Sequence, residues 1–377
     1  MMKVAVAIDS FKGSLSSYQA AKAIKEGVLA VNPDTEVVIQ AVADGGEGTV
    51  DALIEGMNGK KIKVCVHDPL FREHETYYGV VDQTAVMEMA SASGLPLLAL
   101  EERDPLLTTT FGVGEMIMDA VERGYRHFIV GIGGSSTNDG GIGMLMAMGY
   151  RFLDQEDQPI RLGAQDLDKI VKIDDHLVDA RIKECRFEIA CDVSNPLCEE
   201  NGASAVYGPQ KGADAAMIQK MDAGLAHFAF ATTHYNNTDY QEVPGTGAAG
   251  GLGFAFLSYL SAKLVSGIDL VLTFVELEDK LKDADYVFTG EGRMDGQTLM
   301  NKTPIGVARL AKKHGCKVIA LAGGINEEAY VLNDHGIDAM FSIVPGIVDL
   351  EYAMKPENAY RHLKNTAMQI MRLENLK

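Results

Sequence analysis

The sequence predicts an α/β protein of two domains, one of which is assembled from both ends of the chain. Short apolar runs of strand length alternate with stretches of helical periodicity near both termini. In the middle of the chain two such runs follow each other closely, as in a β-hairpin, which favours a mixed sheet there. The 377 residues exceed the roughly 100–200 of one domain, so two domains with buried cores are expected.

The amino-terminal segment has the pattern of a βαβ unit. Residues 4–8 form an apolar run, and Ala20, Ile24, Val28 and Val31 follow at helical spacing. Pro33 ends this helix, because proline disfavours helical geometry in the residue before it. Residues 37–39 then begin a second strand, and such a crossover places the two strands in parallel.

The last third of the chain repeats this alternation. Strands are predicted at residues 286–288, 318–321 and 339–344, and helices at 305–314 and 327–333. Tyr360, Leu363, Ala367 and Ile370 lie three or four residues apart, which is typical of an amphipathic helix packed on a core. Together the two ends predict a Rossmann-like parallel sheet with flanking helices.

The middle of the chain predicts a different sheet. Residues 77–81 and 84–88 form a hairpin-like pair, and strands at 128–130 and 187–190 accompany helices at 114–122 and 214–235. We therefore expect a discontinuous Rossmann-like domain of residues 1–66 and 281–377, interrupted by an inserted α/β domain of residues 67–280. The active site is expected in the cleft between the two.

Composition excludes several classes of partner. A net charge of −19 opposes attraction to nucleic acid and to anionic membranes. No stretch supplies the roughly 20 consecutive apolar residues of a membrane-spanning helix, and Asp9 comes too early for a signal peptide. We expect a cytoplasmic protein, for which an oligomer is compatible with the sequence. The five cysteines form no C-x-x-C pair, so buried, inert thiols are expected.

Five glycine- or hydroxyl-rich segments follow predicted strands, where open α/β sheets bind their ligands. They are residues 9–14, 44–49, 131–141, 191–192 and 289–298. The segment 131–141 could surround a phosphate with backbone N–H groups and hydroxyls, and the following helix would add its positive end. The alternative is a tight turn between strand and helix.

These segments also hold the charged residues suited to catalysis. The carboxylates are hard oxygen ligands that suit Mg²⁺, although each could instead cap a helix or form an Asx turn. Lys12 and Arg293 could meet a phosphate and a carboxylate respectively, or remain solvated. No histidine lies in these segments, so a carboxylate would act as general base. The acidic candidates are Asp9, Asp44, Glu47, Asp139, Asp192, Glu291 and Asp295.

Several common catalytic motifs are absent from the sequence. There is no P-loop, no G-x-S-x-G elbow and no H-E-x-x-H. Residues 245–250 match G-x-G-x-x-G through Gly245, Gly247 and Gly250, but a polar stretch and Pro244 precede them instead of a strand. An NAD-dependent oxidoreductase is therefore an alternative interpretation, and a non-catalytic sugar-acid binding protein is another.

Taken together, three of these segments resemble the type I bacterial glycerate kinase family. They are D-S-F-K-G-S at residues 9–14, A-D-G-G-E-G-T at 43–49 and G-I-G-G-S-S-T-N-D-G-G at 131–141. The resemblance continues in order with N-P-L at 195–197, G-P-Q-K-G-A at 208–213, G-A-A-G-G-L-G at 247–253 and T-G-E-G-R-M-D-G-Q-T at 289–298. It implies ATP- and Mg²⁺-dependent phosphorylation of D-glycerate, with 2-phosphoglycerate as the usual product.

Phosphoryl transfer requires an acceptor held in line and charges that neutralise the transferring group. We predict that Lys12 neutralises the transferring oxygens and that Arg293 grips the glycerate carboxylate in a bidentate fork, with Ser10 and Asp44 also at the substrate. Asp192 and Asp295 are predicted to hold Mg²⁺, although Asp192 could be the base instead. The predicted cradle of the ATP phosphates is Gly133, Gly134, Ser135, Ser136 and Asn138.

Overall fold

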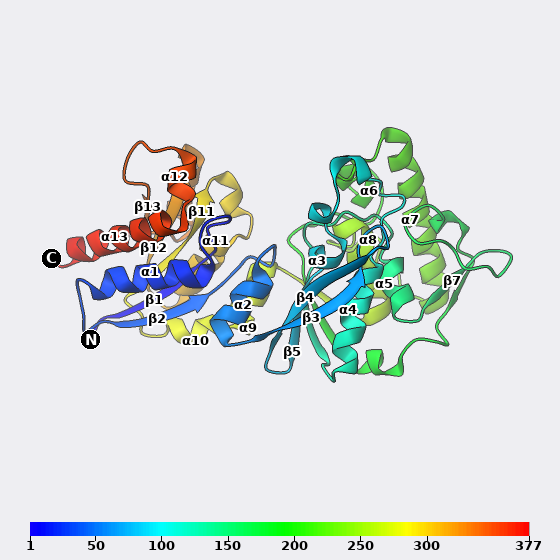
Figure 1. Ribbon diagram of the computed structural model, residues 1–377, viewed down its shortest axis with the longest axis horizontal. Coiled ribbons are helices and arrows are strands. Elements are labelled where there is room, and N and C mark those ends of the chain that lie inside the picture. Colours follow the sequence, from blue (N-terminus) through cyan, green and yellow to red (C-terminus); the bar gives the residue numbers. More distant parts are fainter. Residues whose placement is uncertain (377) are drawn as a thin grey trace. The chain divides into compact units, whose positions relative to one another are not determined.

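The protein, described at residues 1–376 in a computed structural model, forms two compact units. Unit 1 combines Met1–Gly59 with the segment that begins at Ser266, and unit 2 is Lys60–Val265. In Figure 1 the dark blue amino-terminal strands β1 and β2 and the yellow-to-red carboxyl-terminal elements accordingly belong to the same unit, whereas unit 2 runs from lighter blue to yellow-green. The prediction of an α/β fold with one parallel and one mixed sheet is confirmed.

Unit 1 is built on a five-stranded sheet in the order β13-β12-β11-β1-β2. All of its strand pairs are parallel. The chain leaves β1 toward β2 on one side and continues from β11 through β12 to β13 on the other, so β1 and β11 meet where the strand order reverses. Its elements are β1 (Lys3–Ile8), α1 (Ser17–Leu29), β2 (Glu36–Ala41), α2 (Thr49–Met57), α9 (Gly267–Phe274), α10 (Leu277–Leu281), β11 (Tyr286–Met294), η6 (Gly296–Leu299), α11 (Thr303–Lys313), β12 (Lys317–Ile325), η7 (Glu327–His335), β13 (Ala339–Ser342), α12 (Leu350–Met354) and α13 (Pro356–Glu374).

The two faces of this sheet are covered by different helices. Alternate residues of β1, β11 and β12 pack with α1 and α13 in one apolar cluster, as period-two alternation requires. Helices α1 and α13 approach closely at Gly27, where a Cβ would lie 2.3 Å from the Lys364 carbonyl oxygen. Helix α11 packs against β11 and β12. The parallel strands are thus buried on both sides.

Two details of unit 1 differ from the simplest expectation. Residues 289–294 were expected in a loop, but they continue β11, because Glu291 and Arg293 stay in register with Ala322 and Gly324 of β12. The glycines that suggested a loop are explained by close packing between the strands. A Cβ at Gly290 would lie 1.8 Å from the Leu321 carbonyl oxygen of β12. The helix expected at residues 327–333 is the 3₁₀ helix η7.

Unit 2 is built on a six-stranded mixed sheet in the order β10-β9-β6-β5-β4-β3. Strands β3, β4 and β5 are antiparallel, and β5, β6, β9 and β10 are parallel. Strands β7 and β8 form a separate pair. Its elements are β3 (Lys60–His67), β4 (Glu73–Val81), β5 (Thr84–Glu88), α3 (Ala90–Ser93), η1 (Leu95–Leu97), η2 (Leu100–Glu102), α4 (Phe111–Glu122), β6 (His127–Gly131), α5 (Ile142–Ala147), β7 (Arg151–Leu153), η3 (Leu167–Lys169), β8 (Lys172–Asp174), η4 (Ala180–Glu184), β9 (Arg186–Ala190), α6 (Ala203–Tyr207), η5 (Pro209–Lys211), α7 (Ala215–Asn236), α8 (Ala248–Leu260) and β10 (Lys263–Val265).

The limits of the two units differ from the expected domain boundaries by one or two elements. Strand β3 was placed before the boundary at residue 66, but it pairs with β4 in the sheet of unit 2. Helices α9 and α10 were placed before residue 281, but they belong with unit 1. Helix α9 lies against α11 there.

The G-x-G-x-x-G match at residues 245–250 is a turn leading into α8, with no strand directly before it. All five cysteines are free thiols. Cys198 and Cys316 are buried, whereas Cys65 is exposed, so the expectation of buried thiols was wrong for Cys65.

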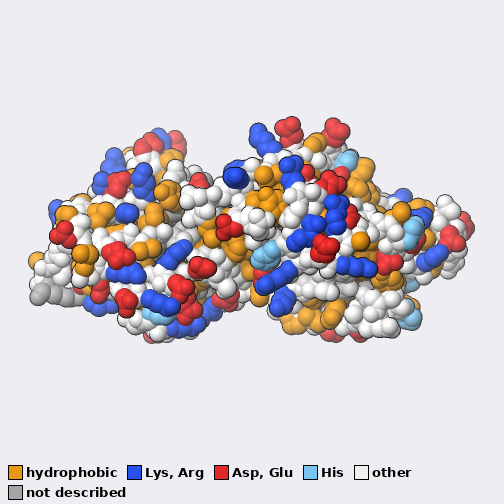
Figure 2. Space-filling view, turned by 90° about the horizontal axis from the view of Figure 1, so that it is seen from below, with side chains coloured by type: hydrophobic (Ala, Val, Ile, Leu, Met, Phe, Trp, Pro, Cys, Tyr) orange, Lys and Arg blue, Asp and Glu red, His pale blue; other side chains and the backbone are white. Residues whose placement is uncertain are grey.

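Within residues 1–376 no helix is both long and apolar enough to cross a bilayer. The face shown in Figure 2 intersperses acidic and basic side chains.

Candidate active site

A cavity of about 590 Å³ lies in unit 1 at the carboxyl ends of its parallel strands. Residues that follow β1 and β2, the ends of β11 and β12, and the segment after β13 all line it. This edge includes the point between β1 and β11 where the strand order reverses, which is where open α/β sheets bind ligands. Six of the predicted candidate residues line this one cavity, namely Asp9, Ser10, Lys12, Asp44, Glu291 and Arg293.

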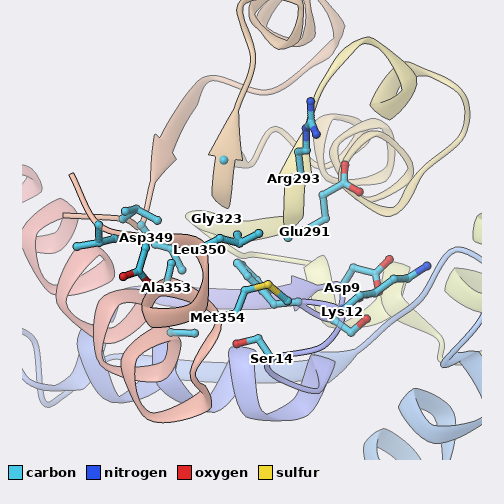
Figure 3. Close-up of a pocket in the computed structure, with 18 of the residues that line it drawn as sticks. Asp9, Lys12, Ser14, Glu291, Arg293, Gly323, Asp349, Leu350, Ala353 and Met354 are labelled. Carbon is cyan, nitrogen blue, oxygen red and sulfur yellow. Dashed lines mark hydrogen bonds between the residues drawn. The ribbon is translucent and has the colours of Figure 1, made fainter. Parts of the chain in front are cut away.

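The loop after β1 is a tight turn that presents Lys12. Backbone hydrogen bonds join Phe11 and Leu15 in both directions, at 2.9 and 3.0 Å. Gly13 at the tip has a φ of +75°, which favours glycine. Phe11 and Leu15 are buried, whereas Lys12 is exposed. In Figure 3 the Lys12 side chain extends from this loop beside Asp9.

Asp9 is the most buried carboxylate of the cavity. Its Oδ2 accepts a hydrogen bond from the Thr303 hydroxyl at 2.6 Å, and its Oδ1 accepts one from the Ser10 N–H at 2.6 Å. Burial, followed by the charge of Asp44, raises the pKa of Asp9 to about 6. The nearby charge of Lys12 opposes this rise. A buried acid with a neighbouring acid is typical of a functional site.

Glu291 lies on β11 at the same end of the sheet. Its Oε1 accepts a hydrogen bond from the Thr298 hydroxyl at 2.7 Å, and its Oε2 lies 3.8 Å from the Lys302 ammonium group. Burial raises the pKa of Glu291 to about 7, and the charges of Asp9 and Asp44 contribute to the rise. The three carboxylates therefore repel one another across this part of the cavity.

The other polar residues near the cavity have contacts of their own. Asp44 accepts a hydrogen bond from the Gly46 N–H at 3.0 Å, as in an Asx turn. The Arg293 side chain is 68% exposed, and its Nε lies 3.8 Å from Oδ2 of Asp295. Asp295 caps η6 by accepting from the Gln297 N–H, and it does not line the cavity. For each carboxylate the sequence allowed a helix cap or an Asx turn as an alternative to metal binding. Asp44 forms such a turn, and Asp295 forms such a cap.

The glycine-rich segment 131–141 follows β6 in unit 2 and is only partly accessible. Gly133 and Gly134 are exposed, and Gly134 has a φ of +73°. The side chains of Ser135, Ser136 and Asn138 are buried. The Ser136 hydroxyl donates to the Ser93 carbonyl at 2.9 Å, and the Asn138 amide donates to the Ser204 hydroxyl at 2.9 Å. These side chains stabilise the conformation of the loop. The part of the loop that solvent or a ligand can reach at this end is the backbone of Gly133 and Gly134.

A buried lysine and a buried aspartate support this loop. Lys211 is only 2% exposed, and its ammonium group donates to the Thr137 carbonyl at 2.6 Å. Burial lowers the pKa of Lys211 to about 7, and the charge of Asp139 opposes that effect. Asp139 accepts hydrogen bonds from the backbone N–H groups of Thr110 and Gly141 at 2.9 and 3.0 Å. Sequence reasoning gave Lys211 no role.

Asp192 and the glycine-rich loop share one edge of the second sheet. Strands β6 and β9 are parallel neighbours with Gly131 opposite Ala190, so the residues that follow each strand emerge at the same edge. Asp192 is exposed there. Unit 1 therefore gathers the predicted substrate and charge-neutralising residues, and unit 2 gathers the predicted phosphate loop with Asp192.

Two residues of the unit 1 cavity region were missed by sequence reasoning. Lys302 lines the cavity beside Glu291, and Thr303 holds Asp9. Both occupy the start of α11, where Pro304 marks the first turn. That proline is a usable signal for a helix start, but the contacts themselves depend on the position of α11 against the sheet.

Comparisons with known proteins agree with the motifs. The family model described as the glycerate kinase family matches residues 4–375. The chain is 47% identical over 374 residues to a glycerate kinase from Haemophilus influenzae, covering 99% of this chain and 98% of that protein. It is 44% identical over 370 residues to the glycerate 2-kinase from Escherichia coli, covering 97% of each.

A solved structure extends this agreement to three dimensions. A protein assigned as glycerate kinase 2 from Salmonella typhimurium LT2 superposes with a TM-score of 0.92 at 42% identity, covering 100% of this chain and 98% of that one. The match of the family model and the identities hold over nearly the full length of each protein. The chain therefore belongs to the glycerate kinase family.

Proposed function

We propose that this protein transfers the γ-phosphoryl group of ATP to D-glycerate, giving 2-phosphoglycerate with the help of Mg²⁺. Membership of the glycerate kinase family supports the acceptor and the class of reaction. The observation that carries the proposal is the cavity of unit 1, which brings Lys12, Lys302 and Arg293 together with three carboxylates at the carboxyl ends of the strands. Cations at such a position can neutralise a phosphoryl group during in-line transfer.

The acidic residues of the cavity fit a magnesium ion that is shared with a nucleotide. Within residues 1–376 no three His, Cys, Asp or Glu side chains are close enough to hold a metal ion by themselves. Mg²⁺ in kinases typically takes one or two carboxylates and completes its shell with phosphate oxygens and water. Asp9, Asp44 and Glu291 repel one another when they are ionised. A divalent cation bound beside them would offset this repulsion.

We propose Asp9 and Asp44 as the carboxylates that hold the ion. When bound, Mg²⁺ would neutralise phosphate charge and orient the phosphoryl group. The ligands predicted from the sequence were Asp192 and Asp295. Asp295 does not line the cavity, whereas Asp9 and Asp44 do, and Asp192 belongs to the loop edge of unit 2, so the acidic cluster of unit 1 is the better candidate.

The remaining residues of the cavity have complementary roles in this proposal. Lys12 neutralises the transferring oxygens from its exposed position on the loop after β1. Arg293 lies exposed on β11, where its planar guanidinium can bind the glycerate carboxylate through two hydrogen bonds. Ser10 donates its backbone N–H to Asp9, and its hydroxyl is proposed to contact the substrate.

A carboxylate is proposed to accept the proton of the attacking hydroxyl group. Glu291 fits this role, because its pKa of about 7 lies near the working pH of most enzymes, where general bases are most effective. Its Oε2 lies 3.8 Å from Lys302, which is beyond hydrogen-bond distance. Asp192, the base considered from the sequence, is the alternative, and separate Glu291→Gln and Asp192→Asn variants distinguish them.

The exposed backbone of Gly133 and Gly134 is proposed to contact phosphate oxygens of ATP. The buried hydroxyls and amide of Ser135, Ser136 and Asn138 support that backbone through contacts within unit 2. Lys211 adds a positive charge under the loop when it is protonated. Backbone N–H groups aimed outward from a glycine-rich turn are a common way to bind an anion.

Product identification tests the proposed function. The protein is incubated with ATP, Mg²⁺ and D-glycerate, and ³¹P NMR follows the products. A resonance of 2-phosphoglycerate is expected together with ADP. Appearance of 3-phosphoglycerate would contradict the proposed position of transfer, and binding of glycerate with no consumption of ATP would contradict a kinase and favour a sugar-acid binding protein.

A further inference from the structure

The cavity of unit 1 has two halves of unlike chemistry. The half next to β1 and β11 holds all of its charged side chains except Asp349. The other half is lined by Phe11 and by apolar side chains from the segment after β13. These are Ile343, Val344, Val348, Leu350, Ala353, Met354 and Ala359. Figure 3 shows Leu350, Ala353 and Met354 together on one side, with Lys12, Glu291 and Arg293 on the other.

The apolar half is a poor match for the proposed acceptor. Glycerate is a small anion with a polar group on every carbon, so it gains nothing from an apolar wall. The whole cavity, about 590 Å³, falls within the range of roughly 300–1,000 Å³ that is typical of pockets for ligands of drug size. A larger ligand with an apolar part and an anionic part would fill both halves.

Part of the apolar wall is left exposed by the rest of unit 1, although Phe11, Ile343 and Ala359 are buried in its core. Helix α12 has no buried residue, and Leu350 at its start is 73% exposed. Val348 and Met354 are also exposed. Apolar surface gathered beside a cavity in this way marks a binding surface more often than isolated apolar residues do.

The wall is nevertheless held in place. Asp349 caps α12 by accepting from the Tyr352 N–H at 2.6 Å. The Asn358 amide of α13 donates to the Tyr352 carbonyl at 2.9 Å. A preformed wall loses little conformational entropy when a ligand binds to it.

We propose that the nucleoside of the phosphoryl donor binds in the apolar half of this cavity, between Phe11 and α12, with its phosphates directed toward Lys12. This inference rests on the proposed function for the identity of the donor. A purine base is flat and largely apolar on its faces, and it is joined through ribose to the triphosphate. The cavity has the same order, since an apolar region continues into one that contains Lys12, Lys302 and Arg293.

Direct binding measurements test the placement without relying on activity. The dissociation constants of ATP, ADP and inorganic tripolyphosphate are measured by calorimetry on the full chain, without glycerate. The test variants Val348→Asn and Leu350→Asn remove apolar wall without adding charge. Ile347→Asn and Leu373→Asn are matched controls, because both positions are exposed and neither lines the cavity.

The expected result separates the nucleoside from the phosphates. Each wall variant weakens ATP and ADP by roughly tenfold and leaves tripolyphosphate within about twofold of the unmodified protein, while the controls change none of the three. Unchanged ATP and ADP affinities in both wall variants would overturn the inference. Equal weakening of all three ligands would also overturn it, because the wall would then not be specific for the nucleoside.

The same protein distinguishes failure of this inference from failure of the proposed function. If ATP binds with the expected dependence on the wall but no phosphate reaches D-glycerate, the proposed reaction is wrong and the nucleoside site stands. If 2-phosphoglycerate is formed but the wall variants bind ATP normally, the reaction stands and the nucleoside lies elsewhere.

Discussion

Neutralising Glu291 should stabilise unit 1 while it impairs catalysis. The unfolded chain ionises this group near its ordinary pKa of 4.5, whereas the folded protein holds the proton up to about 7. Between these values the folded state binds more protons, so its stability falls as the pH rises through this window, and the full cost is present above pH 7. At about 1.4 kcal/mol per pH unit, the difference corresponds to about 3 kcal/mol.

The Glu291→Gln variant removes most of this cost. Glutamine retains an oxygen that can accept the hydrogen bond from Thr298, and the attraction to Lys302 that it loses is already included in the pKa of about 7. We therefore expect a gain of about 2–3 kcal/mol in the free energy of unfolding at pH 8, and less than about 1 kcal/mol at pH 5. Turnover should fall at the same time.

The assay must report on unit 1, because two units can unfold separately. Cys316 is buried in unit 1, and the other four cysteines belong to unit 2. Alkylation of Cys316 in a short pulse at increasing urea, read by mass spectrometry without metal or nucleotide, therefore gives the stability of unit 1. Glu36→Gln, an exposed change on β2, is the control. An equal gain at both pH values, or none at pH 8, would refute the reasoning.

Four further changes test the proposed site. Arg293→Lys keeps the charge but loses the fork, so the KM for glycerate should rise roughly tenfold; unchanged glycerate kinetics would remove Arg293 from the site. Asp192→Asn should lower kcat by roughly 10²-fold or more if Asp192 is the base, and near-normal turnover would leave that role to Glu291. Gly133→Ala adds a methyl group that meets no atom within 4 Å, so folding should be intact and a several-fold rise in the KM for ATP would place phosphate there. Lys211→Met removes the 2.6 Å hydrogen bond to the buried Thr137 carbonyl, which keeps only the Ser135 hydroxyl at 3.3 Å, and should cost unit 2 about 1–3 kcal/mol in urea unfolding.

The strands and helices that the sequence predicted well are those whose apolar pattern is strong. The first βαβ unit and the long helix α7 are found close to their predicted limits. Strand β3, which lies at the edge of its sheet, was missed although Ile62, Val64 and Val66 alternate with the exposed Lys61, Lys63 and Cys65, which is the period-two pattern of a half-buried strand. Charged residues on an edge strand are common, since they discourage pairing with other chains.

The site was predictable in its loops but not in its contacts. Segments after β1, β2 and β6 were found from glycine, hydroxyl and acidic residues alone. The burial of Ser136 and Asn138 was not predictable, because their partners Ser93 and Ser204 come from distant segments. Likewise, the raised pKa of Asp9 depends on burial and then on the charge of Asp44, and only the assembled sheet creates both.

The arrangement of the first sheet constrains how this protein is made. Strand β1 pairs with β2 on one side, but its other partner, β11, begins at Tyr286. At about 5–20 residues per second during synthesis, β1 waits tens of seconds with one hydrogen-bonding edge open, while the whole of unit 2 emerges from the ribosome and can fold. An open strand edge is prone to mispairing, so newly made chains should depend on chaperones until the last strands arrive.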